Sequence, residues 1–151
     1  MAELRPGLFA ELFAAIGAAG EAKAREALLR LGDAAERQAK VNASSGSHAW
    51  GTPTPARPGS GPAIISGTLR RSITRTEPVR VMSGWELKVG TMPGQVPPYG
   101  RTPSSRYGLY LETGLRNGAT YPFLGPAVRF VRTTVLPQVF QAVFRPGWPR
   151  L

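Results

Sequence analysis

The sequence contains no cysteine and only one histidine. Without cysteine, the chain has no disulfide framework, no thiolate ligand for a metal and no cysteine nucleophile. The histidine, His48, lies in a stretch rich in serine, glycine and proline with no acidic residue nearby. A catalytic or metal site needs several convergent side chains, and this residue has no such neighbours in the sequence. We therefore expect no metal and no cofactor.

Long apolar runs are also missing. No run approaches the roughly 18 residues that a membrane span requires, and Glu3, Arg5 and Glu11 interrupt the apolar N-terminal segment. We expect a protein that is neither inserted into a membrane nor exported by a signal peptide. The 151 residues, of which 42% are hydrophobic, suffice for one domain with a substantial core. Residues 1–151 are therefore interpreted as a single domain.

Acidic residues are scarce, with nine against 19 lysines and arginines, and the formal net charge is +10. Sixteen of the basic residues are arginines, whose planar guanidinium suits bidentate contacts with phosphate or carboxylate. This excess favours a polyanionic neighbour, although a GC-rich genome would produce the same preference with no function attached. No catalytic constellation is evident. Glu86 and Glu112 lie in apolar segments, where a lone glutamate more often caps a helix or pairs with arginine than serves as a general acid or base.

Two long stretches have helical periodicity. Residues 8–43 indicate one broken helix or two, since glycines interrupt the apolar pattern. Pro122 fits the first position of a second helix, which continues to Phe144 with apolar residues at intervals of three and four. The apolar face of this helix is wide, so we expect it to lie on a sheet and also to touch a further surface. Residues 145–151 form a tail whose prolines keep it out of the helix.

The middle of the chain predicts a β-hairpin and two short helices. Apolar and polar residues alternate over 74–82 and 85–89 on either side of a Ser-Gly pair, which is typical of a hairpin with one solvated face. A short helical turn is expected after Gly67, because a serine hydroxyl precedes it. Residues 107–114 have the spacing of a second short helix that ends at glycine.

Two stretches without periodicity, 44–62 and 91–105, are rich in glycine, proline and serine and are expected to be mobile loops. Their large side chains, Trp50, Arg57 and Tyr99, are candidates for docking to a partner. The predicted fold class is α+β. It comprises a long or broken N-terminal helix, a small antiparallel sheet built on the hairpin, a short helix and a long C-terminal amphipathic helix packed on the sheet, with 63–144 as the α+β body.

Four segments of the chain, taken in order, carry a resemblance to a known family. They are Ser66-Gly-Thr-Leu-Arg-Arg-Ser-Ile73, Val89-Gly90 at the end of a strand, Tyr107-Gly-Leu-Tyr-Leu-Glu-Thr-Gly114 and Tyr121-Pro-Phe-Leu-Gly-Pro-Ala127. In this order they resemble the tail-completion and head-tail joining (neck) proteins of long-tailed bacteriophages. The resemblance extends from about Gly67 to Phe144.

The resemblance implies a structural protein of the virion and no enzymatic activity. Such a protein forms a homomeric ring, with six-fold symmetry by analogy with the tail it would cap, and joins the tail to the head around the DNA passage. Its implied partners are neighbouring connector, head-completion or tail-tube proteins, with non-specific proximity to double-stranded DNA. It would be assembled in the host cytoplasm and reside in the neck or tail of the virion.

Two sets of candidate site residues follow. The candidate subunit interface comprises Tyr107, Tyr110, Glu112, Pro122, Phe123, Leu124, Phe130 and Phe140. The candidate basic rim, placed for phosphate contacts rather than base reading, comprises Arg70, Arg71, Arg75, Arg101, Arg106 and Arg116.

Three alternatives remain open from the sequence. The protein could bind nucleic acid outside any virion through the same arginines, in which case a recognition helix is expected. It could be a small enzyme, in which case Glu86 or Glu112 should line a deep pocket. In the third alternative the apolar face is entirely internal core and the arginines form an ordinary solvated surface.

Overall fold

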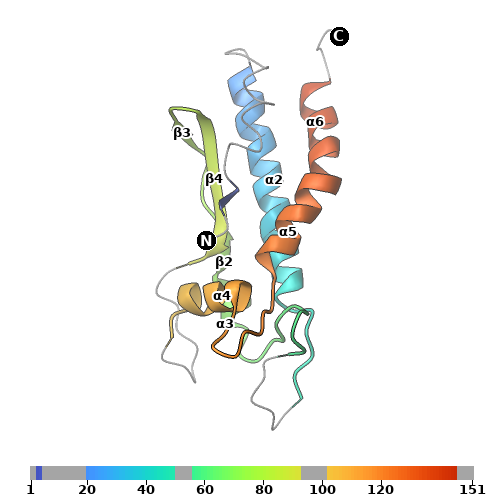
Figure 1. Cartoon of the computed structure of the whole chain (residues 1–151). Coiled ribbons are helices and arrows are strands. Elements are labelled where there is room, and N and C mark those ends of the chain that lie inside the picture. The colour runs from blue at the N-terminus through green and yellow to red at the C-terminus, as the bar shows by residue number, and fades with distance from the viewer. Residues whose placement is uncertain (1–2, 5–19, 50–55, 93–101, 146–151) are drawn as a thin grey trace.

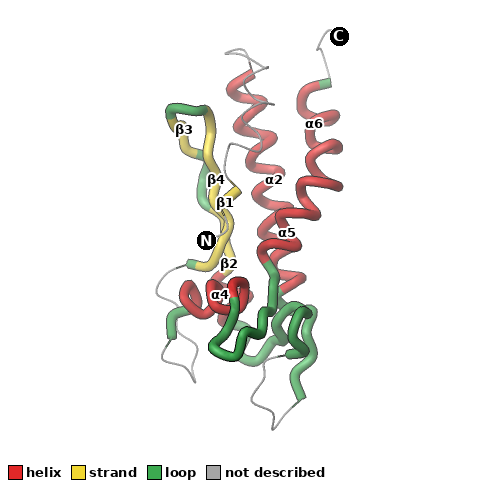
Figure 2. The backbone as a smooth tube through the Cα atoms, in the orientation of Figure 1, coloured by secondary structure: helices red, strands yellow, loops and turns green. Residues whose placement is uncertain are grey.

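The computed structural model describes residues 3–4, 20–49, 56–92 and 102–145. The order of elements is β1 (Glu3–Leu4), α2 (Glu21–Asn42), α3 (Thr68–Ser72), β2 (Ile73–Arg75), β3 (Val79–Val81), β4 (Gly84–Thr91), α4 (Ser104–Thr113), α5 (Leu124–Phe130), the π-helical segment η3 (Val131–Val135) and α6 (Leu136–Phe144). In Figure 1, α2 lies between the sheet and the C-terminal helix formed by α5, η3 and α6, and α3 and α4 lie together at one end of the sheet. Figure 2 shows that, apart from the connections between the strands, the loops of the described chain gather at this same end.

The sheet is antiparallel and is built around β4. This strand pairs with β1 on one side and with both β2 and β3 on the other. Arg75 pairs with Val89 and Val79 with Glu86, so three residues on the outer strand lie opposite two on β4. The extra residue makes a β-bulge. Pro78, which has no N–H to donate, lies in this irregular stretch, where a proline does least harm to the ladder.

The helix α2 packs closely on the sheet because its inner face is made of small residues. Ala27, Ala35 and Ala39 are buried along it. A Cβ added at Gly32 would lie 2.7 Å from both methyl carbons of Leu87 on β4, closer than real side chains approach. The absence of a side chain at this glycine therefore sets the distance between helix and sheet.

The C-terminal helix is continuous from Leu124 to Phe144 but changes its winding in the middle. The π-helical turns of η3 lie immediately before Pro137. A proline inside a helix lacks its N–H and clashes with the carbonyl group four residues earlier, here that of Thr133. A wider π-helical turn relieves this clash, which explains why the segment before the proline departs from α-helical geometry.

The core has two parts. The first joins α2, β4 and the second half of the C-terminal helix, and contains Leu28, Leu31, Leu87, Val89, Val131, Val139, Val143 and Phe144. The second lies where α2 ends, beneath α4 and the start of α5, and contains Ala39, Ala43, Ala56, Ile73, Leu111, Tyr121, Phe123, Leu124 and Ala127. The C-terminal helix thus contributes to both parts, and its wide apolar face is used largely within the chain.

The predicted α+β class, with a long N-terminal helix, a small antiparallel sheet and a long C-terminal helix, is confirmed. Strand β1 was not predicted, because two residues are too few to show an alternating pattern. The short helix expected from Tyr107 begins three residues earlier, at Ser104, directly after Pro103. Of the predicted loop 44–62, the described part returns to the core, since Ala56 and Pro62 are buried. Its mobility stays a prediction.

Candidate functional site

The carboxylate of Glu112 joins α4 to the C-terminal helix. Its Oε2 accepts hydrogen bonds from the backbone N–H groups of Phe123 at 2.9 Å and Leu124 at 3.0 Å, and its Oε1 accepts one from Gly125 at 2.6 Å. The first N–H groups of a helix have no partner within the helix, and its N-terminus favours a negative charge. Glu112, which belongs to α4, supplies both the hydrogen-bond acceptors and the negative charge at the N-terminus of α5. Gly125 permits this approach, because a Cβ there would lie 2.8 Å from Oε1.

The outer side of α4 is a mixed basic and apolar face. Arg106, Leu109, Tyr110 and Thr113 are all exposed and follow one another at intervals of three, one and three residues. Positions three and four apart share one side of an α-helix. The opposite side is buried: Leu111 is in the core, and a Cβ on Gly108 would lie 3.0 Å from the Thr91 side chain. The short helix therefore has one structural side and one exposed side.

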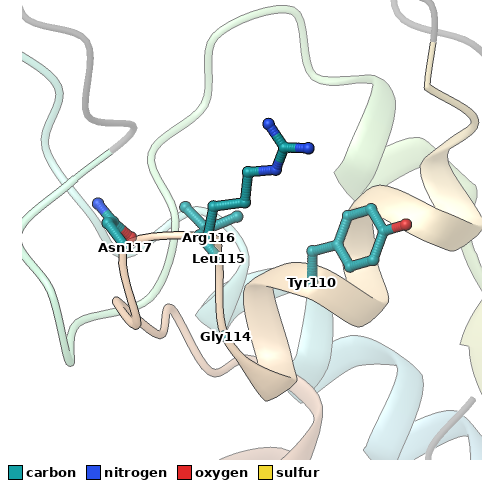
Figure 3. Close-up of a pocket in the computed structure, with 5 residues that line it drawn as sticks. All are labelled: Tyr110, Gly114, Leu115, Arg116 and Asn117. Atoms are coloured by element: carbon teal, nitrogen blue, oxygen red, sulfur yellow. The ribbon is translucent and has the colours of Figure 1, made fainter.

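Two hollows extend this exposed side of α4. An open hollow of about 760 Å³ is lined by Tyr110, Gly114, Leu115, Arg116 and Asn117. Figure 3 shows Tyr110 projecting from α4 and Arg116 extending from the loop that follows it. A smaller hollow, of about 50 Å³, is lined by Tyr107 of α4, Arg70 of α3 and the segment that contains Ile64 and Ile65. The two hollows place Arg70 and Arg116 beside α4.

We use the name α4 surface for the exposed residues on the outer side of α4 together with exposed residues that line the two hollows. Its members are Ile65, Arg70, Arg106, Leu109, Tyr110 and Arg116. Ile65, Leu109 and Tyr110 are 50%, 48% and 44% exposed, so the apolar part of the surface is open to solvent. Burial raises the pKa of the neighbouring Tyr107 phenol, with Tyr121 as a second cause.

The ion pairs of the described chain lie elsewhere, on α2 and on the strands. They join Arg25 to Glu77, Arg30 to Glu26, Lys40 to Glu36, Arg75 to Asp33 and Glu77, Arg80 to Glu21, and Lys88 to Glu86. In contrast, the arginines of the α4 surface form no ion pair with any residue that the structure describes. Among the described residues, the positive charge of the α4 surface is therefore not compensated by ion pairs, whereas that of Arg25, Arg30, Arg75 and Arg80 is.

The residues of the candidate basic rim lie in different surroundings. Arg70, Arg71, Arg106 and Arg116 are exposed, whereas Arg101 lies outside the described residues. Arg75 is wrong as a rim residue. Its side chain is partly buried and bonded to Asp33 and Glu77, which raise its pKa, so its charge is already compensated within the chain.

The residues of the candidate subunit interface also differ in their exposure to solvent. Phe123 and Leu124 are wrong as interface residues, because both are buried in the chain's own core. Glu112 is occupied as the cap of α5, the role that a lone glutamate on a short helix favours. Tyr107 and Pro122 are half-buried. The exposed aromatic candidates are Tyr110 at 44%, Phe130 at 40% and Phe140 at 38%.

The docking candidates of the two loops are mostly untested, since Trp50 and Tyr99 lie outside the described residues and only Arg57 is seen, exposed to solvent. The exposed residues Ile64, Ile65, Met92 and Leu109 were missed by the sequence reasoning. The i, i+3, i+4 spacing of Arg106, Leu109 and Tyr110 would have identified the outer side of α4 if the helix had been extended to Ser104.

Among the described residues, no group of three or more histidine, aspartate or glutamate side chains is placed to bind a metal ion. None of the helices in the described part of the chain combines the length and the apolar character that crossing a bilayer requires. Comparison of the chain with known protein families, curated proteins and solved structures gives no match.

Proposed function

We propose that the chain is a structural protein of the bacteriophage virion, located at the neck or tail end, where it forms a homomeric ring that completes the tail and joins it to the head around the DNA passage. The proposal starts from the resemblance of the ordered motifs between Gly67 and Phe144. On this proposal the protein is assembled in the host cytoplasm, and in the virion it lies beside connector, head-completion or tail-tube proteins.

The observation that best supports a ring is the outer side of the C-terminal helix. Phe130 and Phe140 remain 40% and 38% exposed although the same helix contributes to both parts of the core. Exposed aromatic side chains on a rigid helix are suited to contacts between subunits. In a ring, each subunit presents one surface to the neighbour on one side and a different surface to the neighbour on the other. The C-terminal helix would supply one of these surfaces.

The Glu112 cap supports the same proposal. It links the Glu-Thr-Gly segment of α4 to the Pro-Phe-Leu-Gly-Pro-Ala start of α5, which are two of the motifs that carry the resemblance. The bonded residues of the two motifs are 11 to 13 positions apart in sequence and meet where α4 ends and α5 begins. Their co-occurrence thus has a physical reason, since each needs the other.

The test is native mass spectrometry of the chain and of the particles that contain it. A ring requires one cyclic stoichiometry, six by analogy with the tail, and replacement of Phe130 and Phe140 by Ser should shift the assembly to monomers without unfolding the chain. Replacing the exposed Val79 of β3 by Ser is the matched control. A particle stoichiometry that is incompatible with a closed ring would exclude the proposal.

The second candidate is a basic nucleic-acid-binding protein outside the virion, favoured by the uncompensated arginines at the α3 and α4 end. It requires the isolated chain to bind duplex DNA and to lose affinity when Arg70 and Arg71 are replaced by Ala. Each lost phosphate contact should reduce the salt slope by about 0.9 for duplex DNA. A preference for one DNA sequence, abolished by these replacements, would favour this candidate over the virion ring.

A further inference from the structure

The α4 surface has positive charge without carboxylates of its own. The sequence has no acidic residue from 37 to 76, and Glu112 is the only one after Glu86. Glu112 is already engaged with three backbone N–H groups. Arg70, Arg106 and Arg116 therefore have no acidic neighbour in sequence that is free to pair with them, and among the described residues they form no ion pair.

Apolar side chains lie among these arginines. Leu109 and Tyr110 are about half exposed on the outer side of α4, and Ile65 borders the same small hollow as Arg70. The centres of protein interfaces are enriched in aromatic residues and arginine and depleted in lysine and acids. All three lysines of the chain lie in α2 or β4, and none of them lines either hollow. Contacts to a phosphate backbone would use the arginines but would leave the aliphatic side chains uncovered.

A second copy of the chain is poorly suited to cover this surface. Every carboxylate from Glu21 to Glu86 in the described chain already has a basic partner, and Glu112 has its backbone partners. Each of these carboxylates would have to leave its present partner in order to pair with an arginine of the α4 surface. A second copy would also bring further uncompensated arginines into the contact, and like charges placed together oppose association.

We propose that the α4 surface is a docking site for a different protein, one that presents carboxylates around an apolar depression. Leu109 and Tyr110 enter the depression, and Arg106 and Arg116, which flank them, pair with the carboxylates. Arg70 and Ile65 extend the contact toward α3. This inference goes beyond the ring and does not depend on it, since the surface is separate from Phe130 and Phe140 on the C-terminal helix.

Site-specific photo-crosslinking of the full chain identifies the occupant. p-Benzoylphenylalanine replaces Leu109 in one variant and Phe140 in another. Each variant is produced in cells together with the proteins that the neighbouring genes encode. The Leu109 variant should yield an adduct with a different, acidic protein, and the Phe140 variant reports separately on contacts between copies of the chain. Adducts of the Leu109 variant with a second copy or with nucleic acid would overturn the inference. So would the absence of a Leu109 adduct alongside a Phe140 adduct.

Affinity measurements on the purified pair then test the proposed chemistry. Arg116→Glu should weaken binding by about tenfold or more, as expected when a charge pair in an interface becomes a like-charge contact. Arg129→Glu is the matched control, because Arg129 is also exposed and without an ion pair in the described chain but lies on α5. Changing a facing carboxylate of the partner to Arg should restore binding to the Arg116→Glu chain. Equal losses from Arg116→Glu and Arg129→Glu would refute the assignment of this surface.

Discussion

Replacement of Glu112 is the sharpest test of how the fold connects its two halves. In the native chain its carboxylate accepts three backbone hydrogen bonds, at 2.9, 3.0 and 2.6 Å, from the first turn of the C-terminal helix. A hydrogen bond to a charged group contributes about 1.5 kcal/mol, and the three together would contribute about 4.5 kcal/mol if none were replaced by water. Because Glu112 is half-buried, water can reach part of the site, and we expect Glu112→Ala to cost about 3 kcal/mol.

The glutamine variant separates the charge from the shape. Glutamine has only one side-chain oxygen, so Glu112→Gln can satisfy either Phe123 and Leu124 or Gly125, and its NH₂ group must then face a backbone donor. We expect a loss of about 1.5 kcal/mol, half that of alanine. In a hydrogen-exchange experiment the amides of these three residues should lose protection before those of α2.

The assay is thermal and urea unfolding of the native chain, the Glu112→Ala variant and the Glu112→Gln variant. For a chain of this size a loss of 3 kcal/mol corresponds to a fall in melting temperature of roughly 6–12 °C. Glu86→Ala serves as the control, since Glu86 forms a surface ion pair with Lys88 and its loss should cost less than about 1 kcal/mol. If Glu112→Ala proves no more destabilising than Glu86→Ala, the cap does not connect the two elements in the way described.

Three further predictions follow from the fold. Gly32→Ala should destabilise the chain by about 1 kcal/mol, because the cost of overpacking against the buried Leu87 exceeds the gain in helix propensity; a variant as stable as the native chain would contradict this. The pKa of Tyr107 is raised, so its contribution to stability is present below about pH 10, where an unfolded tyrosine ionises, and is lost as the pH rises through the folded pKa. Tyr107→Phe should flatten the fall in stability above that pH, and an unchanged profile would speak against a buried phenol. Pro137→Ala should restore regular α-helical hydrogen bonds over 131–135, as NMR would show, and a persistent π-helical turn would mean that the proline is not its cause.

The elements that could be predicted from the sequence are those with a sustained period. The hairpin of β3 and β4 was recognisable because apolar residues alternate along it, and the C-terminal helix because they recur at three and four. The π-helical segment could not be deduced from periodicity, since an apolar pattern continues across it. Pro137 was its only local sign.

The sequence predicted the apolar residues of the C-terminal helix but not which of them would be exposed. The C-terminal helix has two adjacent apolar rows, and a sequence does not say which of them faces the core. Phe123 and Phe130 belong to the same row, yet Phe123 is fully buried while Phe130 is 40% exposed. Phe123 lies just before the first residue of α5 and has a non-helical φ of -134°, so its side chain does not continue the row that Phe130 occupies on the helix.

The α4 helix connects the two surfaces for which we propose partners. Leu109 and Tyr110 point outward on the proposed docking side, and within two residues Leu111 enters the core and Glu112 fixes the first turn of the C-terminal helix. That helix in turn carries Phe130 and Phe140, the proposed ring contacts. A short helix cannot shift its outer side without moving its inner side, because both are parts of one hydrogen-bonded unit. Under the two proposals, the Glu112 cap contributes to the relative orientation of the docking surface and the ring surface, and we expect its loss to impair assembly as well as stability.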